Sequence, residues 1–172
     1  STAILVVGNE GLLGITLFMG GESTPSRSVV QSAGYAYRLP RPQVKEEFNR
    51  HGQLLMLMLR YTQSLITQVS QTAVCNRHHA IDQQLCRIIL LCLDRTKDSQ
   101  LALTQELIAR TMGLRREAVT LAAQKLQASG LIQYKRGLIV VTDRAAIERQ
   151  ACECYKIVKS EFDRLLPEEI AS

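Results

Sequence analysis

The chain has 172 residues, of which 46% are hydrophobic and 22% are charged, and 21 Lys and Arg against 16 Asp and Glu give a net charge of +5. This apolar fraction can build a core, which excludes a wholly disordered chain, and the length fits one ordinary domain or two small ones. The most apolar segment, residues 86–93, is too short to cross a bilayer and contains Arg87, so no membrane partner is expected.

Five cysteines are an odd number in a chain too large to need disulfides, which indicates reduced thiols. The apolar residues 3–7 follow no basic region and do not read as a signal peptide. We therefore expect a cytoplasmic protein, and the positive charge permits an acidic partner.

Residues 1–40 have the pattern of short antiparallel strands separated by turns. One apolar run begins at Ile4 and another at Leu12, with glycines at 8, 11, 20 and 21 between and after them, and residues 35–39 alternate. A small open sheet of this kind is marginal alone, so we expect another part of the molecule to cover it.

Pro40 and Pro42 end this region and introduce helix. Over residues 53–72 apolar side chains recur at steps of three and four, which predicts a long helix. Such a stripe packs either against its own domain or against a second chain, and the near-heptad steps leave both open. The candidate dimerisation residues are Leu54, Met58, Tyr61, Leu65 and Val69.

A further helix is expected to begin at Asp82, a good N-cap residue, and its apolar side chains lie nearly all round it. This pattern predicts the core helix of a second domain. We expect the boundary between the two domains to lie between about Val74 and Ile81. The expected division is a sheet region over residues 1–40, a dimerisation helix region over 41–76 and a second domain over 77–172.

Residues 104–129 predict two short helices crossing at a steep angle. Ala109 is small enough for close approach and Gly113 can take a left-handed turn between the helices. The outer face of the second helix then carries Arg116, Glu117, Thr120 and Gln124, which suit the edges of bases in a DNA major groove. The alternative is an ordinary solvated helix face.

The following residues favour DNA. Residues 131–134 and 138–141 read as two strands joined by the basic turn Lys135-Arg136-Gly137, a wing placed to touch phosphate. Residues 104–149 contain eight cations and four anions, so 8 − 4 = +4 of the total +5 lies on this winged helix.

On these residues the chain resembles the Crp/Fnr superfamily of bacterial transcription regulators. The resemblance is carried by Gly11-Leu12-Leu13-Gly14 with Arg27-Ser28, by the helix after Pro40, by Asp82-Gln83-Gln84-Leu85-Cys86-Arg87 and by residues 104–132. It implies an α+β fold with a partial cyclic-nucleotide-type β-roll, a long dimerisation helix and a winged helix-turn-helix. It also implies a homodimer on a near-palindromic site in double-stranded DNA, with RNA polymerase as a further partner.

The resemblance also assigns residues to roles. The base-reading positions would be Arg116, Glu117, Thr120 and Leu121, and those near phosphate Thr104, Gln105, Arg115, Lys135 and Arg136. Leu121 stands where the catabolite activator protein has arginine, so the DNA sequence read should differ. An effector would meet Gly14, Arg27 and Ser28.

Two departures from the family pattern limit these roles. Leu12 replaces the glutamate that cyclic-nucleotide binders keep for the ribose hydroxyls, so no cyclic nucleotide and no other cofactor is expected. Family members also have more strands before the one near Ala3, which leads us to expect a fragment or a shortened relative.

Cys75, His78 and His79 stand at helical spacings and form half of a possible zinc site, or a thiol beside a base. The other candidates are His51 and the pair Cys152-x-Cys154, whose spacing within a helix would put the thiols on different faces, so no metal site is expected. A thiol- or metal-dependent enzyme using Cys75, His78 and His79 is the alternative function, and a protein-binding winged helix is another.

Recognised catalytic motifs are absent from the sequence, so we expect no enzyme and assign no catalytic residues. Apolar residues recur through 152–166 and predict a C-terminal helix, which we expect to pack on its own domain.

Overall fold

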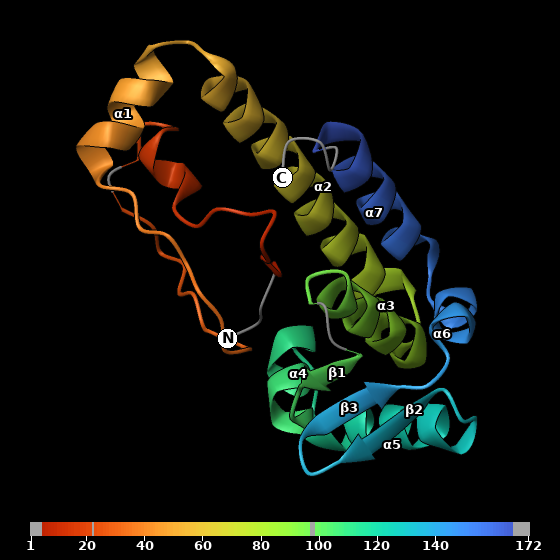
Figure 1. The fold of residues 1–172 in the computed structure, drawn as a ribbon. Coiled ribbons are helices and arrows are strands. Elements are labelled where there is room, and N and C mark those ends of the chain that lie inside the picture. Colours follow the sequence, from red (N-terminus) through yellow and green to blue (C-terminus); the bar gives the residue numbers. More distant parts are fainter. Residues whose placement is uncertain (1–4, 22, 97–98, 167–172) are drawn as a thin grey trace.

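The computed structural model describes residues 5–21, 23–96 and 99–166 (Figure 1). It combines helices with one small sheet, so the α+β class is confirmed. In chain order the elements are the 3-10 helix η1 (Ile15–Leu17), α1 (Arg41–Asn49), α2 (Gln53–His78), α3 (Ile81–Leu93), β1 (Gln100–Ala102), α4 (Gln105–Met112), α5 (Arg116–Ala128), β2 (Ile132–Lys135), β3 (Leu138–Val141), α6 (Arg144–Gln150) and α7 (Glu153–Leu165).

The strands of the expected β-roll do not form in the described part of residues 1–40. Residues 5–21 and 23–40 contain one turn of 3-10 helix and otherwise irregular backbone, and the prediction for residues 1–4 lies outside the described residues. A strand is stable when neighbouring strands pair with its N–H and C=O groups, and residues 5–21 and 23–40 supply no such partner for one another. The apolar alternation at residues 35–39 was therefore misleading, because Tyr35 and Tyr37 are fully exposed.

The beginning of this segment nevertheless packs on the helices. The Arg95 Nε atom lies 2.9 Å from Glu10 Oε1, which ties the segment to the residues after α3. A Cβ added to Gly11 would lie 2.7 Å from the Tyr61 hydroxyl on α2, so the absence of a side chain at residue 11 permits the close approach.

The long helix α2 begins at Gln53 as predicted but continues beyond residue 72 to His78. Pro40 stands at the N-cap of α1, as expected for a proline that introduces a helix. Between the two helices His51 has a φ of 54°, a left-handed conformation that separates α1 from α2.

The predicted dimer stripe on α2 is partly wrong. Met58, Tyr61 and Leu65 are each only 4% exposed, covered by their own chain, and so cannot form a contact between chains. Leu54 and Val69 are more than a third exposed. Periodicity identifies an apolar face but not what covers it, and α2 has a second apolar face that is exposed, carrying Leu59, Ile66, Val69 and Ala73.

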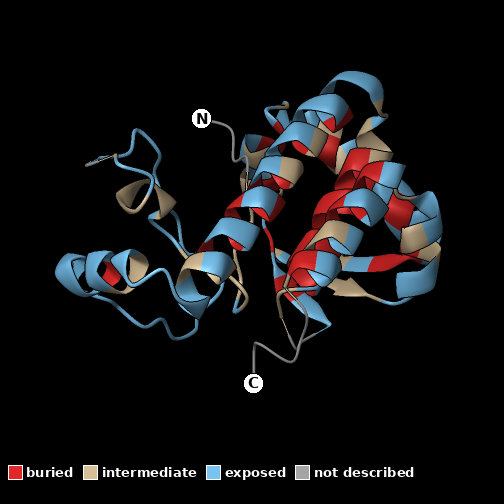
Figure 2. Cartoon of the chain, turned by 90° about the horizontal axis from the view of Figure 1, so that it is seen from above, coloured by how far each residue is buried: buried red, intermediate tan, exposed pale blue. Residues whose placement is uncertain are grey.

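The core lies around α3, whose residues from Gln84 to Leu93 are all buried (Figure 2). This confirms the predicted core helix, but its start was wrong. The N-cap position is Ala80, whose N–H donates to the Gln83 side chain over 3.2 Å, and Asp82 lies in the first turn. There its carboxylate accepts from Lys125 of α5 over 3.1 Å instead of capping the helix.

The sheet is antiparallel in the order β1-β3-β2 and lies against the helices of the second half of the chain (Figure 1). After β3 the chain passes through α6 into α7, the predicted C-terminal helix, which returns to lie along α2 (Figure 1). The second half of the chain is therefore attached to the long helix at two places: through the α2–α3 connection and through α7.

Candidate nucleic-acid interface

The helix-turn-helix forms as the sequence predicts. Thr104 caps α4, its hydroxyl oxygen accepting from the Leu107 N–H over 3.1 Å. Gly113 ends α4 with a φ of 67°, and the Leu114 N–H donates to the Ala109 carbonyl over 3.0 Å. Ala109 is buried, so the small side chain and the left-handed glycine have the roles expected of them.

One face of α5 is buried and the other is open. Val119, Ala122, Ala123 and Leu126 are at most 2% exposed and hold the helix in the core. On the opposite face Arg116, Glu117, Thr120, Leu121 and Gln124 line one shallow hollow. Leu121 is 61% exposed and places an apolar side chain among these polar ones. The four residues assigned to base reading thus share one exposed face.

Thr120 is the least free of these four residues. Its hydroxyl lies 2.8 Å from Gln105 Oε1 and 3.0 Å from the Arg116 carbonyl, so it donates within the protein. The Gln105 N–H in turn donates to the Tyr134 hydroxyl over 3.0 Å. Gln105 therefore links the first turn of α4 to both α5 and the wing.

The wing is a tight hairpin between β2 and β3. Arg136 and Gly137 have φ values of 51° and 81°, the double left-handed conformation of a type I′ turn, which matches the twist of two-residue hairpins. Lys135 and Arg136 are exposed at its tip. A Cβ on Gly137 would lie 3.2 Å from Thr104 Cγ2, so the tip, with Lys135 and Arg136, adjoins Thr104 at the start of α4.

The charges of this domain divide into two groups. Of the eight cations over residues 104–149, Arg110, Lys125 and Arg144 form ion pairs, with Glu106, Asp82 and Asp94 respectively. The remaining 8 − 3 = 5 cations have no side-chain partner among the described residues, and they are Arg115, Arg116, Lys135, Arg136 and Arg149. Four of these five are the cations predicted to contact DNA.

The candidate effector residues do not form a site. Gly14 caps the 3-10 helix η1, while Arg27 and Ser28 are exposed on irregular backbone. Within the residues that the structure describes, Arg27 makes no hydrogen bond or ion pair. The described backbone of residues 5–21 and 23–40 does not bring these residues and Leu12 around one ligand.

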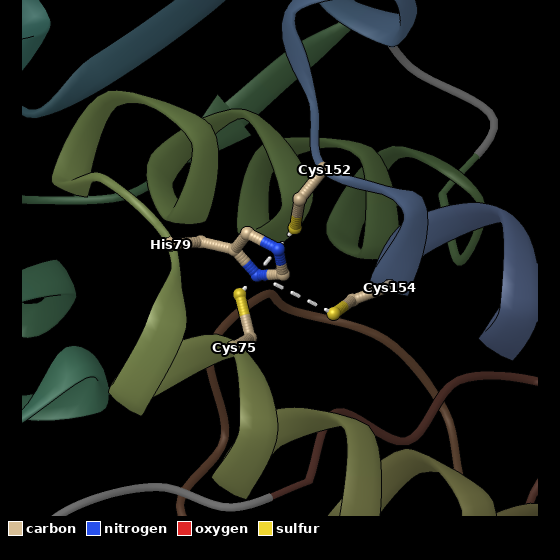
Figure 3. Close-up of side chains that lie close together, drawn as sticks. All are labelled: Cys75, His79, Cys152 and Cys154. Atoms are coloured by element: carbon tan, nitrogen blue, oxygen red, sulfur yellow. Dashed lines mark hydrogen bonds between the residues drawn. The ribbon is translucent and has the colours of Figure 1, made fainter.

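A second group of chemically active side chains comes together that the sequence did not assemble. Ligand atoms of Cys75, His79, Cys152 and Cys154 all lie within 4.8 Å of one another (Figure 3). His78 and His51 are not among them: His78 is exposed on the last turn of α2 and His51 precedes the other end of that helix. The prediction that the Cys152 and Cys154 thiols diverge was wrong, because Cys152 is the N-cap of α7 in extended backbone and not a helical residue.

The thiols of this group differ in acidity. Hydrogen bonds from the Cys75 thiol and the Cys154 N–H lower the pKa of Cys152 to about 6.

The sequence contained one signal for this group, the i,i+4 spacing of Cys75 and His79. Cys152 and Cys154 could not be linked to it from the sequence, because only the packing of α7 on α2 brings them near.

Comparison with known protein families gives a match for the segment that contains the winged helix. Residues 83–150 match the family model described as the Crp-like helix-turn-helix domain. None of the curated proteins matches the chain. The suggested resemblance to the Crp/Fnr superfamily is thereby confirmed over these residues.

Two solved structures have a similar fold. One is a transcriptional regulator of the CRP family from Thermus thermophilus, with a TM-score of 0.50 and 22% identity, covering 56% of this chain and 53% of that one. The other is FixK2 from Bradyrhizobium japonicum, with a TM-score of 0.54 and 17% identity, covering 65% of this chain and 59% of that one. The chain thus spans between half and two thirds of the length of these structures. Among the described residues, no helix is long and apolar enough to cross a membrane.

Proposed function

Because residues 83–150 form a Crp-like helix-turn-helix domain, we propose that the chain is a sequence-specific DNA-binding transcription regulator of Crp/Fnr type. In this proposal α5 enters the major groove and the wing lies along the sugar-phosphate backbone. Arg116 and Glu117 read base edges, Leu121 meets a thymine methyl group, and Arg115, Lys135 and Arg136 meet phosphates.

The observation that carries the proposal is that the cations on the expected DNA face form no ion pairs within the described part of the chain, while other cations of the winged helix do. A cation already bound to a carboxylate adds little to the attraction of a phosphate, and three cations of the winged helix are bound in this way. Four of the five cations without partners among the described residues lie at the start of α5 and at the wing tip, and Arg116 lines the exposed hollow on α5. An ordinary solvated helix face would not require this arrangement.

The proposal includes a homodimer formed along α2. The exposed residues Leu59, Ile66, Val69 and Ala73 follow steps of seven, three and four, the spacing of a coiled-coil seam. Two copies joined along this face would present two α5 helices to successive major grooves about 34 Å apart. RNA polymerase is the further partner in this proposal.

The enzyme alternative receives no support from the structure. It requires Cys75, His78 and His79 to act together, and His78 lies outside the group that forms. Cys75 is completely buried, so a substrate would have no path to its thiol.

Selection from a pool of random-sequence DNA duplexes tests the proposal. The reduced full chain should enrich an inverted repeat whose half-sites are one helical turn apart. Recovery of a duplex pool without any enriched motif would overturn sequence-specific recognition, and a single unrepeated half-site would overturn the dimer.

A further inference from the structure

The group of Cys75, His79, Cys152 and Cys154 joins segments that are more than 70 residues apart in the sequence. Cys75 is on the last turns of α2 and His79 directly follows that helix, while Cys152 and Cys154 are at the start of α7 (Figure 3). The three cysteines are at most 3% exposed, and the His79 side chain is 14% exposed. The group therefore lies inside the contact through which α7 holds the long helix.

The spacing of the ligand atoms fits a single tetrahedral metal ion. With bonds of about 2.3 Å to sulfur and about 2.1 Å to nitrogen, zinc holds two sulfurs about 3.8 Å apart and a sulfur and a nitrogen about 3.6 Å apart. The Cys75 and Cys152 Sγ atoms are 3.5 Å apart, and Cys154 Sγ is 3.6 Å from His79 Nδ1. No pair of the four exceeds 4.8 Å, so small side-chain adjustments bring all of them to one ion.

The surroundings of His79 orient it as metal-binding histidines are oriented. Its Nδ1 faces Cys154 Sγ, and its Nε2 lies 3.2 Å from Glu153 Oε1. A carboxylate on the far nitrogen fixes the tautomer that leaves the near nitrogen free to bind a metal. The backbone is held as well, because the His79 N–H donates to the Cys75 carbonyl and the His79 carbonyl accepts from Gln84 Nε2 over 2.8 Å.

The charge of the surroundings also fits. Three thiolates and one divalent ion leave one negative charge, which needs a neighbouring cation inside a protein. Arg87 of α3 is 3% exposed and has no carboxylate partner among the described residues. Its Nη1 donates to Thr72 Oγ1 over 3.2 Å, three residues before Cys75 on α2, so a buried positive charge lies beside the turn of α2 that carries Cys75.

We propose that Cys75, His79, Cys152 and Cys154 bind one zinc ion, which fastens α7 to the junction of α2 and α3. Four protein ligands leave no open position, so this is a structural site and not a catalytic one. An iron–sulfur cluster would hold its ligands further apart, because several iron and sulfide atoms lie between them. A disulfide would involve only two of the thiols and would not explain why the His79 ring points its Nδ1 atom at Cys154.

The first experiment measures metal in the full chain, purified under reducing conditions without chelators. Elemental analysis should find one zinc per chain, and replacement of zinc by cobalt should give the strong visible bands of tetrahedral cobalt bound to sulfur. Absence of stoichiometric metal after zinc is supplied, iron in its place, or octahedral cobalt bands would each overturn the proposal.

Adjacent residues provide matched variants. H79A should lose the stoichiometric zinc, while H78A should keep it, because His78 is exposed and outside the group. C152S should lose zinc and C92S should keep it, since Cys92 is buried elsewhere on α3. Retention of zinc by both H79A and C152S would contradict the assignment.

A chelator provides a test that does not depend on variants. Its addition to the wild-type chain should lower the thermal midpoint, and zinc should restore it; no change in the midpoint of a zinc-loaded chain would overturn the structural role. None of these measurements involves DNA. A chain that binds zinc but selects no duplex would therefore overturn the proposed function alone.

Discussion

The hydroxyl of Thr120 on α5 donates to the side-chain oxygen of Gln105 on the preceding helix α4 over 2.8 Å. Thr120 thus has a structural bond in addition to any role toward DNA. We expect Thr120→Val, which keeps the shape and the methyl group, to lower the free energy of unfolding by about 0.5–1.5 kcal/mol, the net value of one hydrogen bond, and to leave the sequence preference unchanged. Chemical denaturation measures the stability, and anisotropy titrations with the selected duplex and a scrambled one measure the preference. A change in sequence preference without a loss of stability would instead make the hydroxyl a base reader.

The wing supplies a second prediction. Lys135 is exposed without a partner among the described residues, so Lys135→Ala should weaken binding to all sequences alike and reduce the slope of affinity against salt by about one ion. Arg110→Ala is the matched control, because that guanidinium already lies 2.9 Å from Glu106. Equal effects of the two substitutions would show that the distinction between paired and unpaired cations has no bearing on binding.

The hairpin turn predicts a stability change. Gly137 has a φ of 81° and adjoins Thr104, so Gly137→Ala introduces both a strained backbone and a close contact. We expect a loss of about 1–2 kcal/mol in the free energy of unfolding, measured by chemical denaturation. At Gly34 an added Cβ meets no atom within 4 Å, and Gly34→Ala should leave stability nearly unchanged. Similar losses at the two positions would contradict this account of the turn.

A buried tyrosine gives a third structural test. Tyr155 is 3% exposed; its hydroxyl donates to Asp94 over 3.2 Å and accepts from Arg144 over 2.9 Å, which joins α7 to the end of α3 and to α6. Tyr155→Phe should lower the free energy of unfolding by about 1–3 kcal/mol, because Asp94 and Arg144 each lose a partner. Tyr37→Phe, on a fully exposed side chain, should change nothing measurable in the same denaturation experiment.

Local patterns predicted the winged helix well. Ala109 and Gly113 require a particular backbone approach and a particular turn, and such requirements can be read from sequence. The strands expected before residue 40 depended on distant partners that the described residues do not supply. The Cys/His group depended in the same way on the return of α7 to α2, which spacing along the chain does not reveal.

The long helix α2 also shows the difference between what a local pattern predicts and what depends on distant contacts. Its apolar stripe predicted helix correctly, yet Met58 and Leu65 face their own chain and the exposed stripe includes Ile66. We expect Ile66→Glu, at a side chain that is 60% exposed, to give a folded monomer in sedimentation equilibrium. Arg60→Glu is the control and should leave the dimer intact, because Arg60 is exposed about 120° round the same helix from Ile66. A wild-type chain that is monomeric at every concentration would contradict the dimer itself.

The most direct test of the central claim compares the wild-type chain with Arg116→Ala on two duplexes, one selected and one scrambled. Arg116 is exposed at the first turn of α5 beside the hollow, where a guanidinium can bond a guanine with both arms. The account predicts a loss of about 1–3 kcal/mol on the selected duplex and a much smaller one on the scrambled duplex. Equal losses on both duplexes, or none on either, would contradict base reading by this helix.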